Sequence, residues 1–173
     1  MSTIQTAAII GGGVIGAGWV ARFIENGIDV AIYDPASDAV AKIEAVLQNS
    51  RYAYNKLTKV QRKREGVVSY CDSLAQAVSS AQIIVESVPE RLEVKQSVYA
   101  EIESHAASDA MIVSSTSGIM PSDLQSQMRN PERLLVAHPF NPVYLLPLVE
   151  LVAGQKTRAS VVDAAKAFYL SIG

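Results

Sequence analysis

A glycine-rich turn between a strand and a helix constrains this chain more than any other feature of its sequence. Residues 7–10 (AAII) are a short apolar run, which is typical of a buried strand in a parallel sheet. Residues 14–26 then show the apolar spacing of a helix. The turn between them has the sequence Gly11-x-Gly13-x-x-Gly16. The first glycine of such a turn allows the tight bend, the second lets a pyrophosphate approach the backbone, and the third lets helix and strand pack closely.

The residues around this turn indicate which dinucleotide would bind there. The free N–H groups at the helix start, at Val14 and Ile15, are expected to face the phosphates. Residues 28–33 form the next expected strand, which ends at Asp34. A carboxylate at this position accepts hydrogen bonds from the adenosine ribose hydroxyls and repels a 2′-phosphate. The sequence therefore predicts NAD, rather than NADP, as the cofactor.

Strands and helices are expected to alternate along all 173 residues. This alternation predicts an α/β fold with a Rossmann-type, doubly wound, mostly parallel sheet covered on both faces. We expect residues 1–173 to form one NAD-binding domain, because this length supports a single core and no repeat or linker interrupts it. The further strands are expected at residues 67–71, 82–86, 110–113, 133–137 and 148–152, and the further helices at residues 37–52, 74–79, 92–104, from 121 onward and 157–170.

Composition and charge exclude several classes of function. The net charge is −2, so the chain has no global basic field and nucleic acid is not an expected partner. No apolar stretch is long enough to span a bilayer, and the N-terminus does not have the pattern of a signal peptide. Cys71 is the single cysteine, which excludes a disulfide framework and favours a cytoplasmic location. No metal site is predicted.

Charged residues follow the expected strand at residues 82–86. Pro89, Glu90 and Lys95 come after this strand, at the edge where the strands of a doubly wound sheet face the ligand crevice. We expect these three residues to border the cofactor. The alternative is that Glu90 and Lys95 form an ordinary ion pair on the surface.

A serine-rich turn follows the next expected strand, at residues 114–118 (SSTSG). Hydroxyl groups at this edge can bind a substrate oxygen or the carboxamide of nicotinamide. We expect Ser115 to contact the cofactor and Ser117 to bind the reacting oxygen. The structural interpretation, which is compatible with these roles, is a turn that caps the short helix beginning at Pro121.

A histidine ends the expected strand at residues 133–137 and has a glutamate downstream in the next apolar run. His138 would take a hydroxyl proton during hydride transfer, while Glu150 orients the imidazole and stabilises its protonated form. Asn141, in the same loop, is expected to contact the cofactor. Phe140 or Tyr144 would be able to face a cationic group of the substrate. The alternative is that His138 has only a structural role.

Residues 51–64 hold six basic side chains and no acidic one. Runs of this kind are usually solvated helix faces. The functional alternative is a patch that binds an anionic group, such as the phosphates of a substrate handle.

The chain resembles the NAD-binding domain of the 3-hydroxyacyl-CoA dehydrogenase superfamily. The resemblance rests on the glycine turn, residues 85–92 (VESVPERL), the Ser-Thr-Ser turn, and residues 138–142 (HPFNP) followed by Glu150. It implies His138 and Glu150 as the catalytic pair, Ser117 as a substrate ligand, and cofactor contacts at Asp34, Glu90, Lys95 and Asn141.

The resemblance also implies a substrate class. Family members that act on acyl-CoA esters usually have Asn-Thr-Ser where this chain has Ser115-Thr116-Ser117. Residues 141–151 (NPVYLLPLVEL) are more similar to members that oxidise small 3-hydroxy acids, carnitine above all and gulonate next. The trimethylammonium group of carnitine would suit the aromatic loop. Acyl-CoA oxidation remains the enzymatic alternative, and a non-catalytic, crystallin-like NAD-binding protein is the alternative of another class.

The family has a C-terminal helical domain that supplies further substrate contacts and most of a homodimer interface. The resemblance therefore implies that these 173 residues are the N-terminal part of a two-domain, homodimeric enzyme. On this view, the chain alone binds NAD but has little or no turnover.

Overall fold

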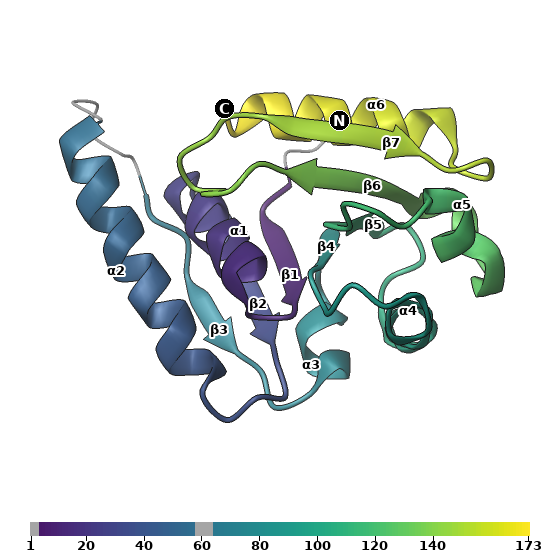
Figure 1. Cartoon of the computed structure of the whole chain (residues 1–173), viewed down its shortest axis with the longest axis horizontal. Coiled ribbons are helices and arrows are strands. Elements are labelled where there is room, and N and C mark those ends of the chain that lie inside the picture. The colour runs from purple at the N-terminus through teal and green to yellow at the C-terminus, as the bar shows by residue number, and fades with distance from the viewer. Residues whose placement is uncertain (1–3, 58–63) are drawn as a thin grey trace.

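The structure is a computed structural model and describes residues 4–57 and 64–173. The described strands form one seven-stranded sheet with the order β3-β2-β1-β4-β5-β6-β7. Neighbouring strands are parallel except for β7, which runs antiparallel to β6 along the edge (Figure 1). The strands are β1 (Thr6–Ile10), β2 (Asp29–Tyr33), β3 (Val68–Tyr70), β4 (Ile83–Glu86), β5 (Met111–Ser114), β6 (Leu134–Pro139) and β7 (Val149–Ala153).

Helices cover both faces of this sheet. They are α1 (Val14–Glu25), α2 (Ala39–Leu57), α3 (Leu74–Val78), α4 (Leu92–His105), α5 (Pro121–Leu124) and α6 (Ala159–Ser171), with 3₁₀ turns at Gln125–Gln127 and Pro131–Arg133. Apolar side chains alternate between two clusters, since successive strand residues point to opposite faces. Ile9 belongs to a cluster that includes side chains of α1, α2 and α6, whereas Ile10 belongs to a second cluster that includes side chains of α3, α4 and α5. The predicted doubly wound sheet with two covered faces is confirmed.

The first crossover unit positions the glycine turn. β1 is almost fully buried, and its register pairs Ile10 with Tyr33 of β2. The turn after Ile10 leads directly into α1, and in Figure 1 it lies at the lower end of β1. β1 also pairs with β4, so the strand order reverses beside the turn. Ligands of doubly wound sheets bind at this reversal point.

Most element boundaries lie within one or two residues of the predicted ones, and the differences at α2 and β6 bear on the site. α2 continues to Leu57, because Tyr54, beyond the predicted end at residue 52, is still buried against the rest of the protein. β6 includes His138 and Pro139, which were expected just after the strand. The two 3₁₀ turns were not predicted. None of the helices in the described part of the chain has both the length and the apolar character needed to cross a membrane.

Candidate active site and cofactor cradle

Backbone sterics require glycine at two positions of the first turn. Gly11 has φ of 98°, and its N–H donates to the carbonyl of Tyr33 at 2.9 Å. A Cβ on Gly16 would lie 1.8 Å from the carbonyl oxygen of Gly11. Gly13 is different, because a Cβ there would have no protein atom within 4 Å. The open space at Gly13 and the adjoining start of α1, with Val14 exposed and Ile15 half-buried, fit the approach of a pyrophosphate.

Asp34 is fixed beside this turn by two backbone amides. Its Oδ2 accepts from the N–H of Gly12 at 2.6 Å, and its Oδ1 accepts from the N–H of Ala36 at 2.8 Å. A carboxylate has about four acceptor positions, so both oxygens can still accept bonds from ribose hydroxyls. The side chain is half-buried at the carboxyl end of β2, next to the cradle. The geometry therefore fits the predicted preference for NAD.

Asp34→Asn tests this preference. The substitution removes the negative charge but retains one oxygen, so we expect about tenfold to hundredfold weaker NAD binding and a smaller discrimination against NADP. This range corresponds to the roughly 1.5–3 kcal/mol of a hydrogen bond to a charged group. Calorimetric titration with both dinucleotides measures the effect. Asp38→Asn is the matched control, because Asp38 is an exposed carboxylate that pairs with Lys42 at 2.8 Å. An unchanged ratio of the two affinities in Asp34→Asn would contradict the assignment.

The structure corrects the alternative of a surface ion pair between Glu90 and Lys95. Lys95 is 1% exposed, and its Nζ lies 2.6 Å from Glu86 Oε1 and 3.3 Å from Glu90 Oε2. Glu90 and the neighbouring Pro89 are exposed. Lys95 is thus a buried cation between two carboxylates. Glu86, for which no role was predicted, is its nearer partner.

Glu90 holds the serine-rich turn. Its Oε1 accepts from the backbone N–H groups of Ser117 at 3.1 Å and Gly118 at 3.0 Å, and from the hydroxyl of Thr116. Burial acts to raise the pKa of Glu90, but the bonds from Thr116 and Gly118 and the charge of Lys95 together lower it below its ordinary value. Ser117 is exposed on the turn that this carboxylate fixes.

The predicted capping role of the serine-rich turn is wrong. α5 begins after Met120, whose side chain makes no capping hydrogen bond, and Pro121 occupies the first helical turn. The side chain of Thr116 instead bonds within the turn, where its Oγ1 accepts from the N–H of Ile119 at 3.1 Å.

Ser115 is held by two partners that the sequence did not indicate. The indole N–H of Trp19 donates to Ser115 Oγ at 3.2 Å, and the Ser87 hydroxyl lies 3.0 Å from the same oxygen. Ser115 therefore links α1 to the ends of β4 and β5. The structure places it at the predicted edge of the sheet.

Strand pairing brings His138 and Glu150 together. The antiparallel register of β6 and β7 places the two residues directly opposite each other. His138 Nδ1 lies 2.9 Å from Glu150 Oε2, and the ring is tilted against Phe140 with centroids 5.6 Å apart. The His138 side chain is 29% exposed. With Nδ1 bound to the carboxylate, Nε2 is the ring nitrogen left to exchange a proton with a ligand.

The β6–β7 loop packs on α1 through a small-residue contact. A Cβ on Gly18 would lie 2.8 Å from Cβ of Val143, so the helix needs glycine there for the loop to approach. Tyr144 stacks edge-on against Tyr54 of α2, whereas Phe140 and Asn141 are exposed. Of the two aromatic candidates for a cationic group, Phe140 is the one beside His138.

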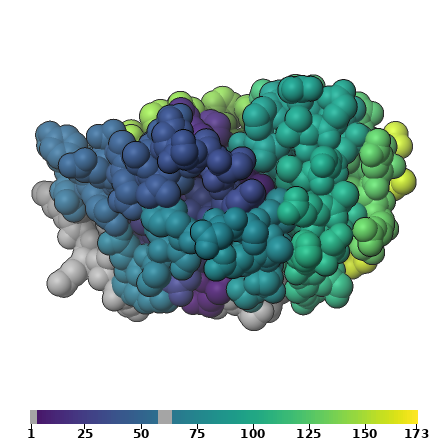
Figure 2. Space-filling model, turned by 90° about the horizontal axis from the view of Figure 1, so that it is seen from below, coloured from purple at the N-terminus to yellow at the C-terminus, as the bar shows by residue number. Residues whose placement is uncertain are grey.

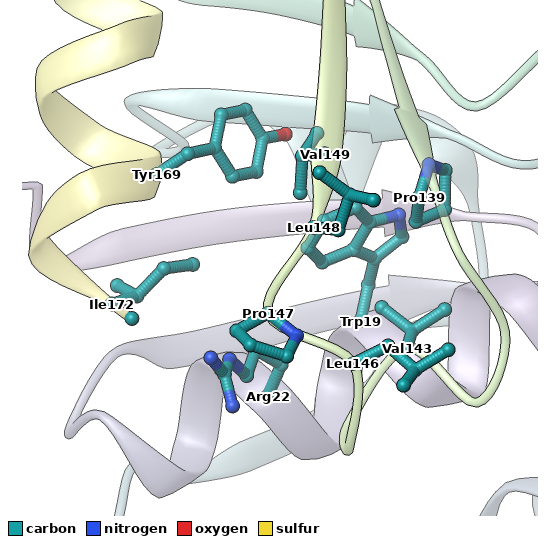
Figure 3. A pocket seen from close by; sticks show the side chains of 11 residues that line it. Trp19, Arg22, Pro139, Val143, Leu146, Pro147, Leu148, Val149, Tyr169 and Ile172 are labelled. Carbon is teal, nitrogen blue, oxygen red and sulfur yellow. The ribbon is translucent and has the colours of Figure 1, made fainter.

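A pocket under this loop is not the site of the chemistry. It lies between the loop, α1 and the end of α6, with Trp19, Pro147 and Tyr169 among its lining side chains (Figure 3). Its volume of about 10 Å³ admits no more than a water molecule. The side chains around this pocket pack the loop that follows His138 against α1 and α6.

The described part of the basic segment is largely neutralised. Arg51 pairs with Glu65 at 3.0 Å, and Arg64 pairs with Asp29 at 2.6 Å. Hydrogen bonds from Arg64 lower the pKa of Asp29 below its ordinary value. Residues 58–63 of this segment lie outside the described residues. Among the described residues, no group of three or more His, Cys, Asp or Glu side chains is arranged to hold a metal ion.

The cradle and the His–Glu pair define a class of protein. Figure 2 looks at the molecule from below, with α2 in blue on one side, the α4 region in teal and green on the other, and a little of the purple N-terminal segment between them. A doubly wound sheet with a glycine turn, an acidic residue after β2 and a His–Glu pair at strand ends is the arrangement of an NAD-dependent dehydrogenase. Residues 6–173 match the model of the family "3-hydroxyacyl-CoA dehydrogenase, NAD binding domain". The chain belongs to this family, whose members bind NAD, and the expected family and cofactor are confirmed.

Similar proteins of known identity include several carnitine dehydrogenases. The chain is 52% identical to L-carnitine dehydrogenase of Mesorhizobium japonicum, over 100% of this chain and 48% of that protein. It is 44% identical to L-carnitine dehydrogenase of Oceanobacillus iheyensis, over 98% of this chain and 55% of that protein. The chain thus spans about half the length of these relatives.

Solved structures show the same fold. The NAD⁺-dependent 5-formyl-3-hydroxy-2-methylpyridine 4-carboxylic acid 5-dehydrogenase superposes with a TM-score of 0.92 and 34% identity, over 99% of this chain and 56% of that one. 3-Hydroxybutyryl-CoA dehydrogenase of Escherichia coli superposes with a TM-score of 0.89 and 28% identity, over 99% of this chain and 37% of that one.

Proposed function

We propose that the protein oxidises the 3-hydroxyl group of L-carnitine to 3-dehydrocarnitine with NAD. The observation that carries the proposal is the contact of 2.9 Å between His138 Nδ1 and Glu150 Oε2 at the strand ends. The relatives named L-carnitine dehydrogenase, at 52% and 44% identity, support the substrate. The chemistry that NAD supplies when bound is the acceptance of a hydride.

Three side chains have proposed roles in this reaction. His138 removes the proton of the hydroxyl group through Nε2, and Glu150 orients the ring and stabilises the imidazolium that forms. Ser117, on the turn fixed by Glu90, donates a hydrogen bond to the reacting oxygen. Asp34, Glu90, Ser115 and Asn141 would hold NAD together with the glycine turn, where the N–H groups at the start of α1 would bind the pyrophosphate.

Two features favour a small cationic substrate over an acyl-CoA ester. Phe140 is 37% exposed beside His138, and its ring offers a face to a trimethylammonium group. Arg51 and Arg64 are both paired with carboxylates, which leaves less positive charge at these two positions for the phosphates of CoA.

We also propose that the second half of the relatives' length forms a domain that covers this edge and mediates homodimer formation. The β6–β7 loop and β7 leave Leu146, Leu148 and Val152 between 43% and 53% exposed, which is apolar area that a packed partner would bury. A cytoplasmic location follows from the single cysteine and remains part of the proposal.

The test is NAD reduction by the full-length protein, with L-carnitine, L-gulonate and 3-hydroxybutyryl-CoA measured in parallel. We expect the highest kcat/KM with carnitine, and we expect the 173-residue chain to bind NAD with little or no turnover. Faster oxidation of either other substrate would reassign the specificity. NAD binding without reduction by any of the three would favour the non-catalytic alternative.

A further inference from the structure

A fully buried charged cluster lies behind the serine-rich turn. Glu86, Tyr99 and Ser114 are each 0% exposed, and Lys95 is 1% exposed. They come from β4, α4 and β5, so the cluster joins three elements at one edge of the sheet. Neither the proposed reaction nor the cofactor cradle requires a carboxylate at this depth.

Glu86 has a donor for each of its acceptor positions. Its Oε1 accepts from Lys95 Nζ at 2.6 Å and from the N–H of Val88 at 2.9 Å. Its Oε2 accepts from the hydroxyls of Tyr99 and Ser114, each at 2.6 Å. A buried carboxylate with four donors is held in one position, since any rotation leaves donors without a partner.

Lys95 transmits this fixed position to Glu90. Its ammonium group has three protons and faces three oxygens, namely Glu86 Oε1, the Val88 carbonyl at 3.3 Å and Glu90 Oε2 at 3.3 Å. All three donors are therefore directed into the protein. Lys95 therefore holds Glu90 at the edge of the sheet where the cofactor is expected.

Glu90 in turn fixes the backbone that bears Ser117. Its other oxygen, Oε1, accepts from the amides of Ser117 and Gly118. The chain of contacts thus runs from a buried glutamate, through a buried lysine and an exposed glutamate, to the turn where the reacting oxygen would bind. Each step is an ion pair or a hydrogen bond to a charged group, which are the stronger polar contacts in proteins.

We propose that Glu86 is a positioning residue for the active site: it anchors Lys95, and through Lys95 and Glu90 it sets the position of the Ser117 turn. The catalytic part of this inference rests on the proposed function, because Ser117 matters to the reaction only if it binds the reacting oxygen. The structural part does not rest on the proposed function. The amides of Ser117 and Gly118 bond to Glu90, so their exchange rates show directly whether Glu90 has moved.

Amide hydrogen exchange, followed by NMR, tests the structural part. In Glu86→Gln the buried counter-charge of Lys95 is lost, so Lys95 should draw the Glu90 carboxylate inward and away from the two amides. We expect exchange at Ser117 and Gly118 to become at least about tenfold faster. Exchange at Met111, whose N–H donates to Gln82 within the sheet, should not change.

Glu103→Gln is the matched control. Glu103 lies on α4, as Lys95 and Tyr99 do, and accepts from the backbone amides of Arg129 at 2.9 Å and Asn130 at 2.7 Å, which are not part of the cluster. We expect no change at Ser117 or Gly118 in this variant. Tyr99→Phe removes one donor from Glu86 without removing charge, and should give a smaller increase, about threefold, even where Glu86→Gln fails to fold. Unchanged exchange at both amides in a folded Glu86→Gln, or in Tyr99→Phe, would overturn the proposal.

Steady-state kinetics of the full-length protein test the catalytic part. We expect Glu86→Gln to lower kcat about tenfold to hundredfold, because the displaced turn carries the hydroxyl group that would bind the reacting oxygen. A purely structural residue would lower the amount of folded enzyme and leave its kcat unchanged, and that result would refute the catalytic part. If the wild type does not oxidise carnitine, the proposed function fails, but the exchange experiment still decides the role of Glu86.

Discussion

His138→Asn should lower kcat of the full-length protein for carnitine by about 10²–10⁴-fold, the usual contribution of a positioned general base. Asparagine can place its amide nitrogen near the position of Nδ1, so the bond to Glu150 at 2.9 Å has a substitute. It has no counterpart of Nε2, so no group can take the hydroxyl proton. NAD affinity should stay within about threefold of the wild type, because the ring lies at β6 rather than in the glycine turn.

The second histidine of the chain provides the control. His105 is exposed in the last turn of α4, and His105→Asn should leave kcat and KM unchanged. Stopped-flow measurement of NADH formation separates a slower chemical step from slower product release. If His138→Asn retained more than about a tenth of the wild-type kcat, His138 would not be the base, because general-base catalysis contributes at least about a hundredfold.

The fold was predictable because its signals are local. The glycine turn needs only Gly11, Gly13 and Gly16 in sequence, and the buried strands are short apolar runs of β-branched and small residues. Each of these features lies within a short stretch of sequence, so no long-range contact has to be known. The direction of β7 was not predicted, because an apolar run does not indicate which way a strand pairs.

The partners within the site were harder to predict. Glu150 was expected to serve His138, but the contact depends on the β6–β7 register, which the loop geometry sets and a shift of one residue would abolish. Glu86 does have a sequence signal, because it is a charged residue directly after the apolar run Ile83–Val85. A carboxylate on a buried strand requires a buried partner. The sequence does not show that Lys95 is this partner, because the contact depends on how α4 packs on the sheet.

Gly16→Ala should lower the free energy of unfolding by about 3 kcal/mol or more and abolish measurable NAD binding. The added Cβ would lie 1.8 Å from the Gly11 carbonyl oxygen, and neither atom belongs to a flexible side chain that can move aside. Overpacking of a core side chain costs about 1–3 kcal/mol, and a clash with backbone is harder to relieve. α1 must shift away from β1, which moves the helix start from the end of the first strand. Urea unfolding and NAD titration on the same samples measure both effects.

Gly13→Ala separates cofactor approach from folding, because it adds the same methyl group where no protein atom lies within 4 Å. Gly13 has φ of −65°, which alanine adopts without strain, so the free energy of unfolding should change by no more than about 1 kcal/mol, the usual effect at a helix N-cap. NAD binding should still weaken at least about tenfold, since the methyl group fills the space where the pyrophosphate meets the backbone. Equal losses of stability in Gly13→Ala and Gly16→Ala would contradict the prediction that the turn tolerates a methyl group at residue 13 but not at residue 16. Unimpaired NAD binding by a stable Gly13→Ala would place the pyrophosphate away from this turn.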